Sequence, residues 1–293
     1  MDLNSFLRER KALVENELRE IFAAFPASSK TLIEAMEYSL FSEGKRIRPC
    51  LAMAACEAMG GDVEEVLPFA AAIEMIHTYS LIHDDLPCMD NDDFRRGRPT
   101  CHKVFGEAVA LLAGDALLTE AFKVMGDPRR STASPSTTRE VIYEVALAAG
   151  AAGMVVGQTM DVVYEGKKGS KRIVNLIHRN KTSALIRAAV LTGAILGRAN
   201  RRELKGFSTF GESIGLAFQI RDDLLDVEGT EAEVGKKLKK DTEKQTYVRH
   251  YGVAASKARI DELVDTAIAS VRFLGGQADM LVKMAEFIGH RSF

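Results

Sequence analysis

Hydrophobic residues recur at spacings of three and four along almost the whole chain. In residues 3–22 they fall on roughly one stripe, which is typical of a helix with one buried face. Alternation with a period of two is not sustained anywhere, so we predict no strand. The same helical pattern returns in residues 30–42, 47–59, 63–85, 104–125, 138–164, 173–196, 202–227, 253–272 and 276–288.

The breaks between these segments carry turn-forming residues. Gly60-Gly61-Asp62, Gly126-Asp127-Pro128 and residues 129–138 are such breaks. None of them has the composition of a linker between domains, and no internal repeat of fixed period is present. A chain of 293 residues is long enough to bury a large core. We therefore predict a single all-α domain that covers residues 1–293.

Composition narrows the classes of partner. With 46% hydrophobic and 27% charged residues the chain resembles ordinary soluble proteins, and its net charge of −2 favours neither nucleic acid nor an anionic membrane. No run reaches the about 18 apolar residues of a membrane span, and the N-terminal residues have no signal-peptide pattern. Cys50, Cys56, Cys88 and Cys101 form no metal or disulfide spacing. We expect a cytoplasmic protein with reduced thiols.

Adjacent aspartates occur twice, each time at the end of an apolar segment. The pairs are Asp84-Asp85 and Asp222-Asp223. In the second cluster Asp222 and Asp226 are four residues apart, so they share a helix face and repel each other by a few tenths of a kcal/mol. A bound divalent cation reverses that repulsion, and carboxylates shared with substrate phosphates are the ligands that Mg²⁺ prefers.

The first cluster has a different spacing. Asp84 and Asp90 are six residues apart, which on a continuous helix would place them about 120° out of phase. Pro87 disfavours helical geometry at Leu86, so we predict that the chain leaves the helix there and that Asp90 folds back towards Asp84. Acidic runs are often solvated surface, but both clusters follow strongly apolar segments. We therefore interpret them as the acidic ends of buried helices.

Cations accompany the aspartates. Arg95-Arg96 directly follows the first cluster, and the planar guanidinium fork matches phosphate oxygens. A second basic group, residues 44–49, opens a helix whose N-terminus attracts anions. His77 lies two turns before Asp84 on the same face, and it is either a phosphate contact or a core histidine. Lys181-Thr182 begins a further helical stretch, and Lys236, Lys237, Lys239, Lys240 and Lys244 form a basic segment that is either solvated or closes onto phosphate.

Four motifs together carry a family resemblance. HDDLPCMDNDDFRRGRPTCH, GKRIRP, NKT and QIRDDLLDVEG, spread over roughly residues 44–247, resemble the trans-isoprenyl diphosphate synthases, in particular bacterial farnesyl or geranylgeranyl diphosphate synthases. The resemblance implies one helical bundle around a deep central cavity, usually as a homodimer. It also implies a reaction in which isopentenyl diphosphate is joined head to tail to dimethylallyl or geranyl diphosphate. Ionisation, condensation and elimination follow one another, with three Mg²⁺ ions bound with the diphosphate.

The resemblance also assigns roles by matching position. The magnesium ligands would be Asp84, Asp85, Asp90, Asp222, Asp223 and Asp226. Isopentenyl diphosphate would contact Gly44, Lys45, Arg48, His77 and Arg96. The allylic diphosphate would contact Arg95, Lys181, Thr182, Gln219 and Lys236, with Thr182 and Gln219 near the developing cation.

Two further features bear on the length of the product and on the role of the basic segment from Lys236 to Lys244. Tyr79 and Ser80 lie about one turn below Asp84, where a bulky ring should stop a growing chain. An aromatic residue there is similar to enzymes with a fifteen-carbon product, so we predict farnesyl diphosphate, with geranylgeranyl diphosphate as the alternative. The segment from Lys236 to Lys244 is shorter than in the family and lacks its usual glycine, which leaves the diphosphate contact of Lys244 open.

Three other functions fit the same residues less well. A class I terpene cyclase uses a similar bundle, but its second metal site mixes Asn, Ser or Thr with Glu, and it needs no basic site like that of Lys45 and Arg48. A non-catalytic regulatory subunit of a prenyltransferase would lose metal ligands that this chain keeps. A di-iron bundle would need paired Glu-x-x-His motifs, and none is convincingly placed.

Overall fold

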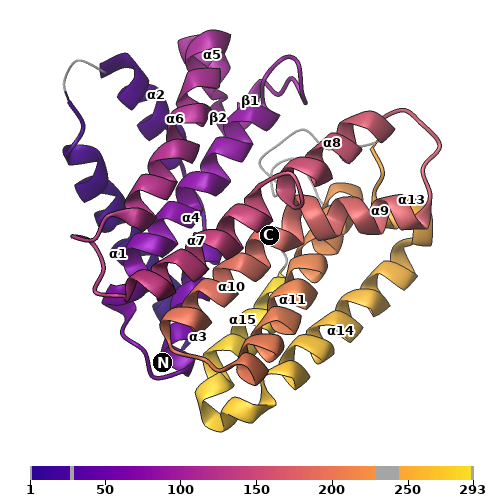
Figure 1. The fold of residues 1–293 in the computed structure, drawn as a ribbon. Helices are drawn as coiled ribbons and strands as arrows, with labels where there is room; N and C mark the ends of the chain where they lie inside the picture. Colours follow the sequence, from indigo (N-terminus) through magenta and orange to yellow (C-terminus); the bar gives the residue numbers. More distant parts are fainter. Residues whose placement is uncertain (1, 27–29, 229–243, 292–293) are drawn as a thin grey trace.

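The computed structural model describes residues 2–26, 30–228 and 244–291, and most of these residues are in helices (Figure 1). The predicted all-α class is therefore confirmed. The N-terminal and central helices are α1 (Leu3–Ala23), α2 (Lys30–Leu40), α3 (Ile47–Ala58), α4 (Val63–Asp84), α5 (Cys101–Phe105), α6 (Glu107–Gly126), α7 (Pro135–Ala149), α8 (Met154–Tyr164) and α9 (Lys171–Ile177). After them come the π-helix η2 (His178–Ser183), α10 (Ala184–Leu196), α11 (Arg201–Glu228), α13 (Tyr247–Tyr251), α14 (Val253–Ser270), the 3₁₀ helix η4 (Arg272–Ala278) and α15 (Asp279–His290).

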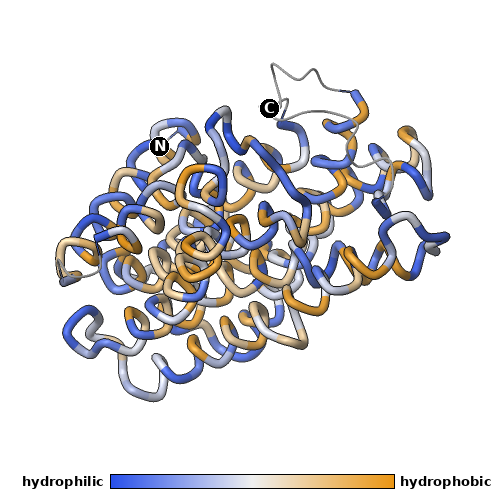
Figure 2. The backbone as a smooth tube through the Cα atoms, turned by 90° about the horizontal axis from the view of Figure 1, so that it is seen from above, coloured by the Kyte–Doolittle hydropathy of each residue, from blue (hydrophilic) through white to orange (hydrophobic). Residues whose placement is uncertain are grey.

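Helix α4 lies at the centre of the bundle and packs against α3, α6 and α10. It is hydrophobic on nearly all sides, as expected for a helix without a solvated face. Asp62 caps its N-terminus by accepting a hydrogen bond of 3.0 Å from the backbone N–H of Glu64. Hydrophobic stretches gather in the middle of the bundle and polar ones at its periphery (Figure 2). The helix therefore carries its C-terminal aspartates on a rigid, buried support.

The predicted helix over residues 138–164 is two helices. A turn at Gly150–Gly153 separates α7 from α8, and a Cβ on Gly153 would lie 2.1 Å from the carbonyl oxygen of Ala148. Only glycine fits such a close approach. Among the described residues, Pro135–Tyr164 is the one stretch whose length and composition would suit a membrane crossing, with 39% of its window buried. Neither α7 nor α8 alone reaches the about 20 residues that a span needs.

The prediction of no strand was wrong at one short hairpin. Strand β1 (Phe94–Arg95) pairs antiparallel with β2 (Arg98–Pro99). The two connecting residues, Arg96 and Gly97, both have positive φ, as a tight two-residue hairpin turn requires. Two-residue strands are too short to show alternation, so no pattern could reveal them. The turn sets Arg95 and Arg96 beside the end of α4.

Candidate active site

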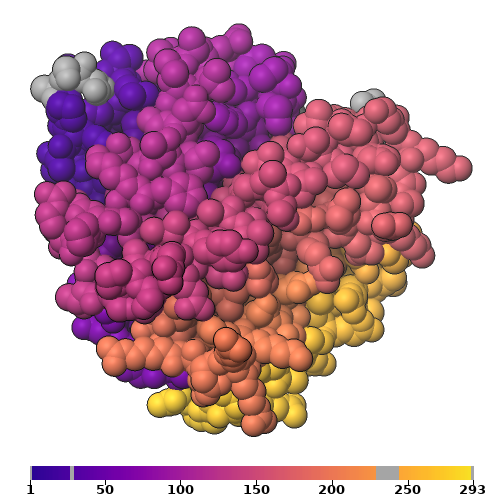
Figure 3. Space-filling model, in the orientation of Figure 1, coloured from indigo at the N-terminus to yellow at the C-terminus, as the bar shows by residue number. Residues whose placement is uncertain are grey.

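A cavity of about 1110 Å³ lies between the two halves of the bundle, with walls from α4, the β1–β2 hairpin, α8, η2, α11 and residues 244–246. A notch between the region around α5 and α6 and the end of α8 is visible in Figure 3. Both aspartate clusters contribute to the wall. The residues of interest that line the cavity are Arg48, His77, Tyr79, Ser80, Asp84, Asp90, Arg95, Arg96, Lys181, Thr182, Gln219, Asp222, Asp223 and Lys244.

The first cluster folds as its sequence predicts. Helix α4 ends at Asp84, and the backbone N–H of Asp90 donates to the Asp84 carbonyl at 2.9 Å. Asn91 adopts a positive φ of 50° as the chain turns back. Burial raises the pKa of Asp84 to about 6, with Lys181 opposing the shift and Asp90 adding to it. Two carboxylates therefore meet at the end of α4, and burial penalises the charge of Asp84.

Asp85 has a different environment. Its side chain is buried, and both oxygens accept hydrogen bonds from Arg95, at 2.8 Å from Nε to each oxygen and 2.6 Å from Nη2 to Oδ1. Such a charge-assisted pair fixes the guanidinium in one orientation. Asp85 is not part of the cavity wall, whereas Arg95 is. The second aspartate of the pair thus holds an arginine at the site.

The basic residues of the loop before α3 divide between the cavity and the interior. Arg46 has a positive φ of 50° and is buried, where it donates to Glu74 at 2.9 Å and to the Leu40 carbonyl at 2.7 Å. Arg48 lines the cavity. Gly44 and Lys45 do not line it, and the Lys45 ammonium lies 5.1 Å from the centre of the Phe287 ring.

Arg48 and Arg96 give one part of the cavity wall its positive charge, and His77 lines the cavity near them. Burial lowers the pKa of His77 well below its ordinary value, and the neighbouring arginines add to the effect, led by Arg48. Burial likewise lowers the pKa of Arg48 to about 10. Arg96 donates to the Ser42 hydroxyl at 3.1 Å, and a Cβ on Gly44 would lie 2.9 Å from its Nη1. Glycine at position 44 therefore makes room for this arginine.

The second cluster lies on one continuous helix, α11. Asp222 is paired with Arg291, which follows the last helix, and the Arg291 carbonyl accepts from Arg221 Nε at 2.7 Å. Asp223 is bound by the protein: Oδ1 accepts from the Gln219 amide at 3.0 Å and Oδ2 from the Tyr247 backbone N–H at 2.6 Å.

The π-helix η2 places two further predicted residues. Lys181 Nζ donates to Asp161 of α8 at 2.7 Å, and the Thr182 hydroxyl donates to Gln219 Oε1 at 2.6 Å. A Cβ on Gly157 of α8 would lie 2.1 Å from the Lys181 backbone nitrogen, so the two segments touch without an intervening side chain. Wide helical turns of this kind are frequent at functional sites.

The remaining predicted residues concern the mouth and the walls of the cavity. Lys244 Nζ donates to Asp90 at 2.9 Å, which places this lysine at the first cluster. Lys236 lies outside the described residues. Tyr79 is buried and packs edge-on against His83, with ring centres 5.6 Å apart, while the Ser80 hydroxyl donates to the His77 carbonyl at 2.8 Å. Both line the cavity.

Sequence reasoning missed several side chains of this site. Asp161 is the partner of Lys181, and Arg291 is the partner of Asp222. Buried His178 lies 3.3 Å from Asp223. Gln158 of α8 lines the cavity with both amide atoms buried, and neither has a hydrogen-bond partner within the part of the chain that the structure describes. These residues lie 20 to 69 positions from their partners or have none, so no local spacing could reveal them.

The model of the polyprenyl synthetase family matches residues 29–271. The chain belongs to this family. It is 43% identical over 295 residues to the geranylgeranyl diphosphate synthase of Cyanophora paradoxa, with 99% of this chain and 97% of that protein covered. It is 41% identical to the farnesyl diphosphate synthase of Bacillus subtilis, with 99% and 98% covered. The predicted resemblance is thereby confirmed.

Solved structures agree with this polyprenyl synthetase fold. An FPP/GFPP synthase of Zymomonas mobilis superposes with a TM-score of 0.89 at 36% identity, and the match covers 98% of each chain. A geranyltransferase of Legionella pneumophila gives a TM-score of 0.88 at 31% identity, and the match covers 99% of this chain and 96% of that one. The predicted single helical bundle of the isoprenoid synthase type is the fold of this polyprenyl synthetase.

The donor set suits magnesium. Among the described residues no three His, Cys, Asp or Glu side chains converge as a ready-made metal cage. Magnesium is usually bound by one or two carboxylates together with substrate phosphates, so a complete protein cage is not required. The negative charges of Asp84 and Asp90 repel each other, and a hard cation between the two carboxylates would relieve this repulsion. These oxygens therefore fit the magnesium dependence of the polyprenyl synthetases.

Proposed function

We propose that this polyprenyl synthetase condenses isopentenyl diphosphate with an allylic diphosphate, dimethylallyl or geranyl, and releases a longer allylic diphosphate. The observation that carries the proposal is that one cavity is lined by aspartates of both clusters and by arginines and lysines around them. Curated relatives with farnesyl and geranylgeranyl products cover nearly the whole chain, which supports this reaction. The cavity is also large enough for two substrates.

The allylic diphosphate would be held at the two clusters. When bound, magnesium neutralises the negative charge that develops on the leaving diphosphate. Asp84, Asp90, Asp222 and Asp226 are the carboxylates we assign to that metal, and the number of ions stays a prediction. Because Asp85 and Asp223 are already bound by Arg95, Gln219 and the Tyr247 backbone, we assign them to orienting these groups instead.

The chain's own residues then account for the chemistry. Arg95 and Lys181, each fixed by a carboxylate, bind the allylic diphosphate. The hydroxyl of Thr182 donates to Gln219 Oε1, which holds the two side chains together, and we assign their oxygens to stabilising the developing allylic cation. Arg48, His77 and Arg96, which line the cavity, bind isopentenyl diphosphate, whereas the contact of Lys45 stays a prediction because Lys45 does not line it. Proton loss needs no side-chain base, because the released diphosphate can accept the proton.

Product length follows from the apolar end of the cavity. Tyr79 is 7% exposed and stands below Asp84, so its ring limits the space for a growing chain. We assign farnesyl diphosphate as the product, with geranylgeranyl diphosphate as the second candidate. Tyr79→Ala should shift products from fifteen to twenty or more carbons in chromatographic analysis. An unchanged product distribution would remove Tyr79 as the limiting residue.

A homodimer is part of the proposal. Large apolar side chains are exposed on three consecutive helices: Leu111 and Leu112 of α6, Tyr143 of α7, and Val155 of α8. These helices form the face turned towards the viewer in Figure 3. Exposed apolar area of this kind marks association surfaces. Leu112→Asp combined with Tyr143→Asp should halve the mass measured by light scattering, and an unchanged mass would place the contact elsewhere.

The decisive experiment is product analysis with purified protein and labelled isopentenyl diphosphate. Each allylic primer is supplied in turn, with Mg²⁺ or with a chelator. Condensation that needs both substrates and metal supports the proposal. Consumption of farnesyl diphosphate alone would indicate a cyclase, and absence of turnover with every primer would indicate a regulatory subunit.

A further inference from the structure

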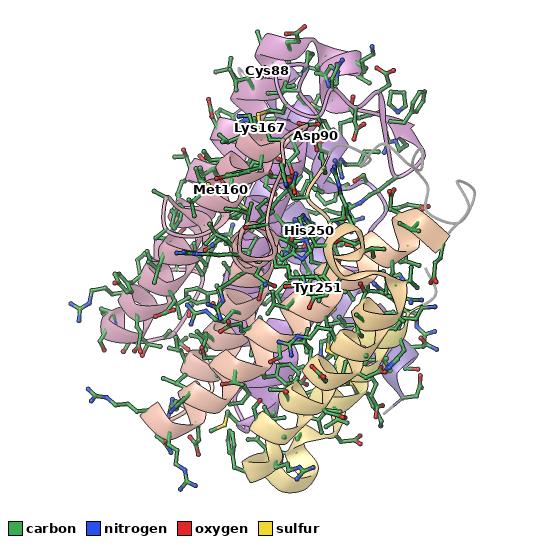
Figure 4. The ribbon with its side chains drawn as sticks, turned by 90° about the vertical axis from the view of Figure 1, so that its right-hand side faces the viewer. Cys88, Asp90, Met160, Lys167, His250 and Tyr251 are labelled. Atoms are coloured by element: carbon green, nitrogen blue, oxygen red, sulfur yellow. The ribbon has the colours of Figure 1, made fainter. Side chains whose placement is uncertain are left out.

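The segment Lys244–Tyr247, called the 244–247 strap below, connects both aspartate clusters. At one end the Lys244 ammonium donates to Asp90 of the first cluster at 2.9 Å and lies 4.0 Å from Asp161. At the other end the Tyr247 backbone N–H donates to Asp223 of the second cluster at 2.6 Å. Three residues of the strap, Lys244, Gln245 and Thr246, line the cavity, and Asp90 is labelled in Figure 4.

Gln245 attaches the middle of the strap to a different part of the fold. Its side-chain amide nitrogen donates to the carbonyls of Tyr164 and Lys167, each at 2.9 Å, in the connection between α8 and α9. The residue is 3% exposed. Two carbonyl acceptors fix the orientation of the amide, since only nitrogen can donate to both. Oε1 must therefore accept from His250 Nε2, 2.9 Å away.

The surroundings of Gln245 are shaped around its amide. A Cβ on Gly169 would lie 1.9 Å from Gln245 Oε1. His250 comes from α13, which is itself docked on α9 through a hydrogen bond of 3.1 Å from the Asn175 amide to the Tyr251 hydroxyl. Every polar atom of the Gln245 side chain therefore has a partner, and Gly169 packs directly against its amide oxygen. His250 and Tyr251 are labelled with Lys167 in Figure 4.

We propose that Gln245 is a positioning residue, which sets the Lys244 ammonium between Asp90 and Asp161 so that it meets the metal-bound diphosphate. This inference rests on the proposed function for the identity of the diphosphate substrate. Lys244 has a long and flexible side chain, so its place depends on where its backbone is held. The adjacent Gln245 side chain supplies that anchor, and Arg249 supports it by donating to the Lys244 carbonyl at 3.2 Å.

Gln245→Glu tests the anchor with a nearly isosteric change. A carboxylate cannot donate to the Tyr164 and Lys167 carbonyls, so the strap should detach. We expect the KM for the allylic diphosphate to rise about tenfold, as for other residues that orient a ligand. The KM for isopentenyl diphosphate should stay within about twofold, since the strap does not contact that site. Gly169→Ala, which pushes on the amide from outside the strap, should act in the same direction.

Matched controls lie together on η4. Gln277 is exposed, so Gln277→Glu should leave both KM values unchanged. A Cβ on Gly276 meets nothing within 4 Å, so Gly276→Ala is the control for Gly169→Ala. Far-UV circular dichroism and thermal melts of all four variants verify that they are folded at the assay temperature.

A double-mutant cycle with Lys244→Ala separates positioning from a general structural role. If Gln245 acts through Lys244, Gln245→Glu should change the KM by less than about twofold once the lysine is absent. The same tenfold rise in both backgrounds, or no rise in the chain that keeps Lys244, would overturn the proposal.

Calorimetric binding of magnesium diphosphate gives a second readout that does not need turnover. The unaltered protein should bind it, and Gln245→Glu should weaken binding by about tenfold. Absence of condensation with intact binding would refute the proposed function and leave this inference standing. Failure of the unaltered protein to bind magnesium diphosphate would refute the inference itself.

Discussion

The two aspartate clusters each combine adjacent aspartates with a further carboxylate, but the protein holds these carboxylates in different ways. In the first pair only Asp84 lines the cavity, whereas Asp222, which is paired with Arg291, and Asp223 both line it in the second pair. The second aspartate of each pair is bound by the protein: Asp85 holds Arg95, and Asp223 holds Gln219 and the Tyr247 backbone N–H. We therefore assign one carboxylate of each adjacent pair to metal and the other to organising the groups around it.

The clusters differ in how the chain brings in a further carboxylate. On α11 the helical repeat alone places Asp226 on the face of Asp222. At the end of α4 the helix stops, and a turn returns Asp90 to the Asp84 carbonyl. On a continuous helix two carboxylates share a face within one turn only at spacings of three or four, whereas a broken helix can use a spacing of six if the turn closes. The first cluster therefore depends on its turn and on the 244–247 strap, and the second depends on its helix.

The largest expected effect comes from replacing a carboxylate that we assign to metal, in contrast to one whose oxygens are both bound by the protein. Asp84→Asn removes a charge that we assign to the metal, so kcat should fall by about 10³-fold, equivalent to roughly 4 kcal/mol of transition-state stabilisation. The Mg²⁺ concentration for half-maximal rate should rise at the same time. Initial rates over a magnesium titration measure both quantities.

Asp223→Asn is the matched variant for this comparison. Its amide can accept one of the present hydrogen bonds and opposes the other with a donor, so Gln219 and the strap lose their shared anchor. We expect a loss of about 10- to 100-fold in kcat with little change in the Mg²⁺ requirement. A large rise in that requirement would show that Asp223 itself binds metal, and the division of labour would then be wrong.

How far the sequence predicted these clusters follows from the range of the interactions involved. The return of Asp90 was predictable, because proline acts on its immediate neighbours. The pairing of Asp222 and Asp226 on one face was predictable, because helical periodicity is local. The partners of Asp85 and Asp223 were not, since each depends on which of several nearby donors packing brings closest. Arg291, 69 residues from Asp222, left no trace in the spacing.

The same reasoning explains the errors in secondary structure. The hairpin at Arg95 and Arg98 is two residues long on each side, below the length at which alternation can be seen. The break at Gly150–Gly153 lies inside an apolar run, where glycine and alanine keep the pattern helical. The π-helix at Lys181 adds a residue to one turn without changing hydrophobicity. Hydrophobic periodicity indicates which residues are buried. These features change the backbone geometry without changing which residues are buried, so the periodicity does not reveal them.

A pH series tests whether the buried charge of the first cluster lowers the free energy of unfolding. Burial raises the pKa of Asp84 to about 6 from an ordinary 3.8, so above pH 6 the folded protein carries a charge that the unfolded chain hydrates better. This cost is fully present above about pH 6 and disappears below about pH 4. In metal-free protein, Asp84→Asn should increase the free energy of unfolding by roughly 3 kcal/mol at pH 8 and by nothing at pH 4.

Denaturant unfolding with chelator present measures this difference. Asp265→Asn, at an exposed position on α14, is the control and should leave stability unchanged at both pH values. Equal effects of Asp84→Asn at pH 8 and pH 4 would show that the change acts through packing, and the first cluster would then store no electrostatic cost.

The smallest expected effect concerns the cation that the protein itself supplies to each cluster. Lys244 takes this place at Asp90, and Arg291 takes it at Asp222, whose side chain is 43% exposed. An ion pair with an exposed partner contributes about 0–1 kcal/mol, so Arg291→Gln should lower the Mg²⁺ concentration for half-maximal rate by at most about fivefold. The direction follows because the guanidinium competes with metal for the same carboxylate. Arg201→Gln, at an exposed position in the first turn of α11, should leave it unchanged. A higher Mg²⁺ requirement in Arg291→Gln would mean that the arginine orients Asp222 for metal, as Gln245 orients Lys244. The two clusters would then work in the same way although their backbones differ.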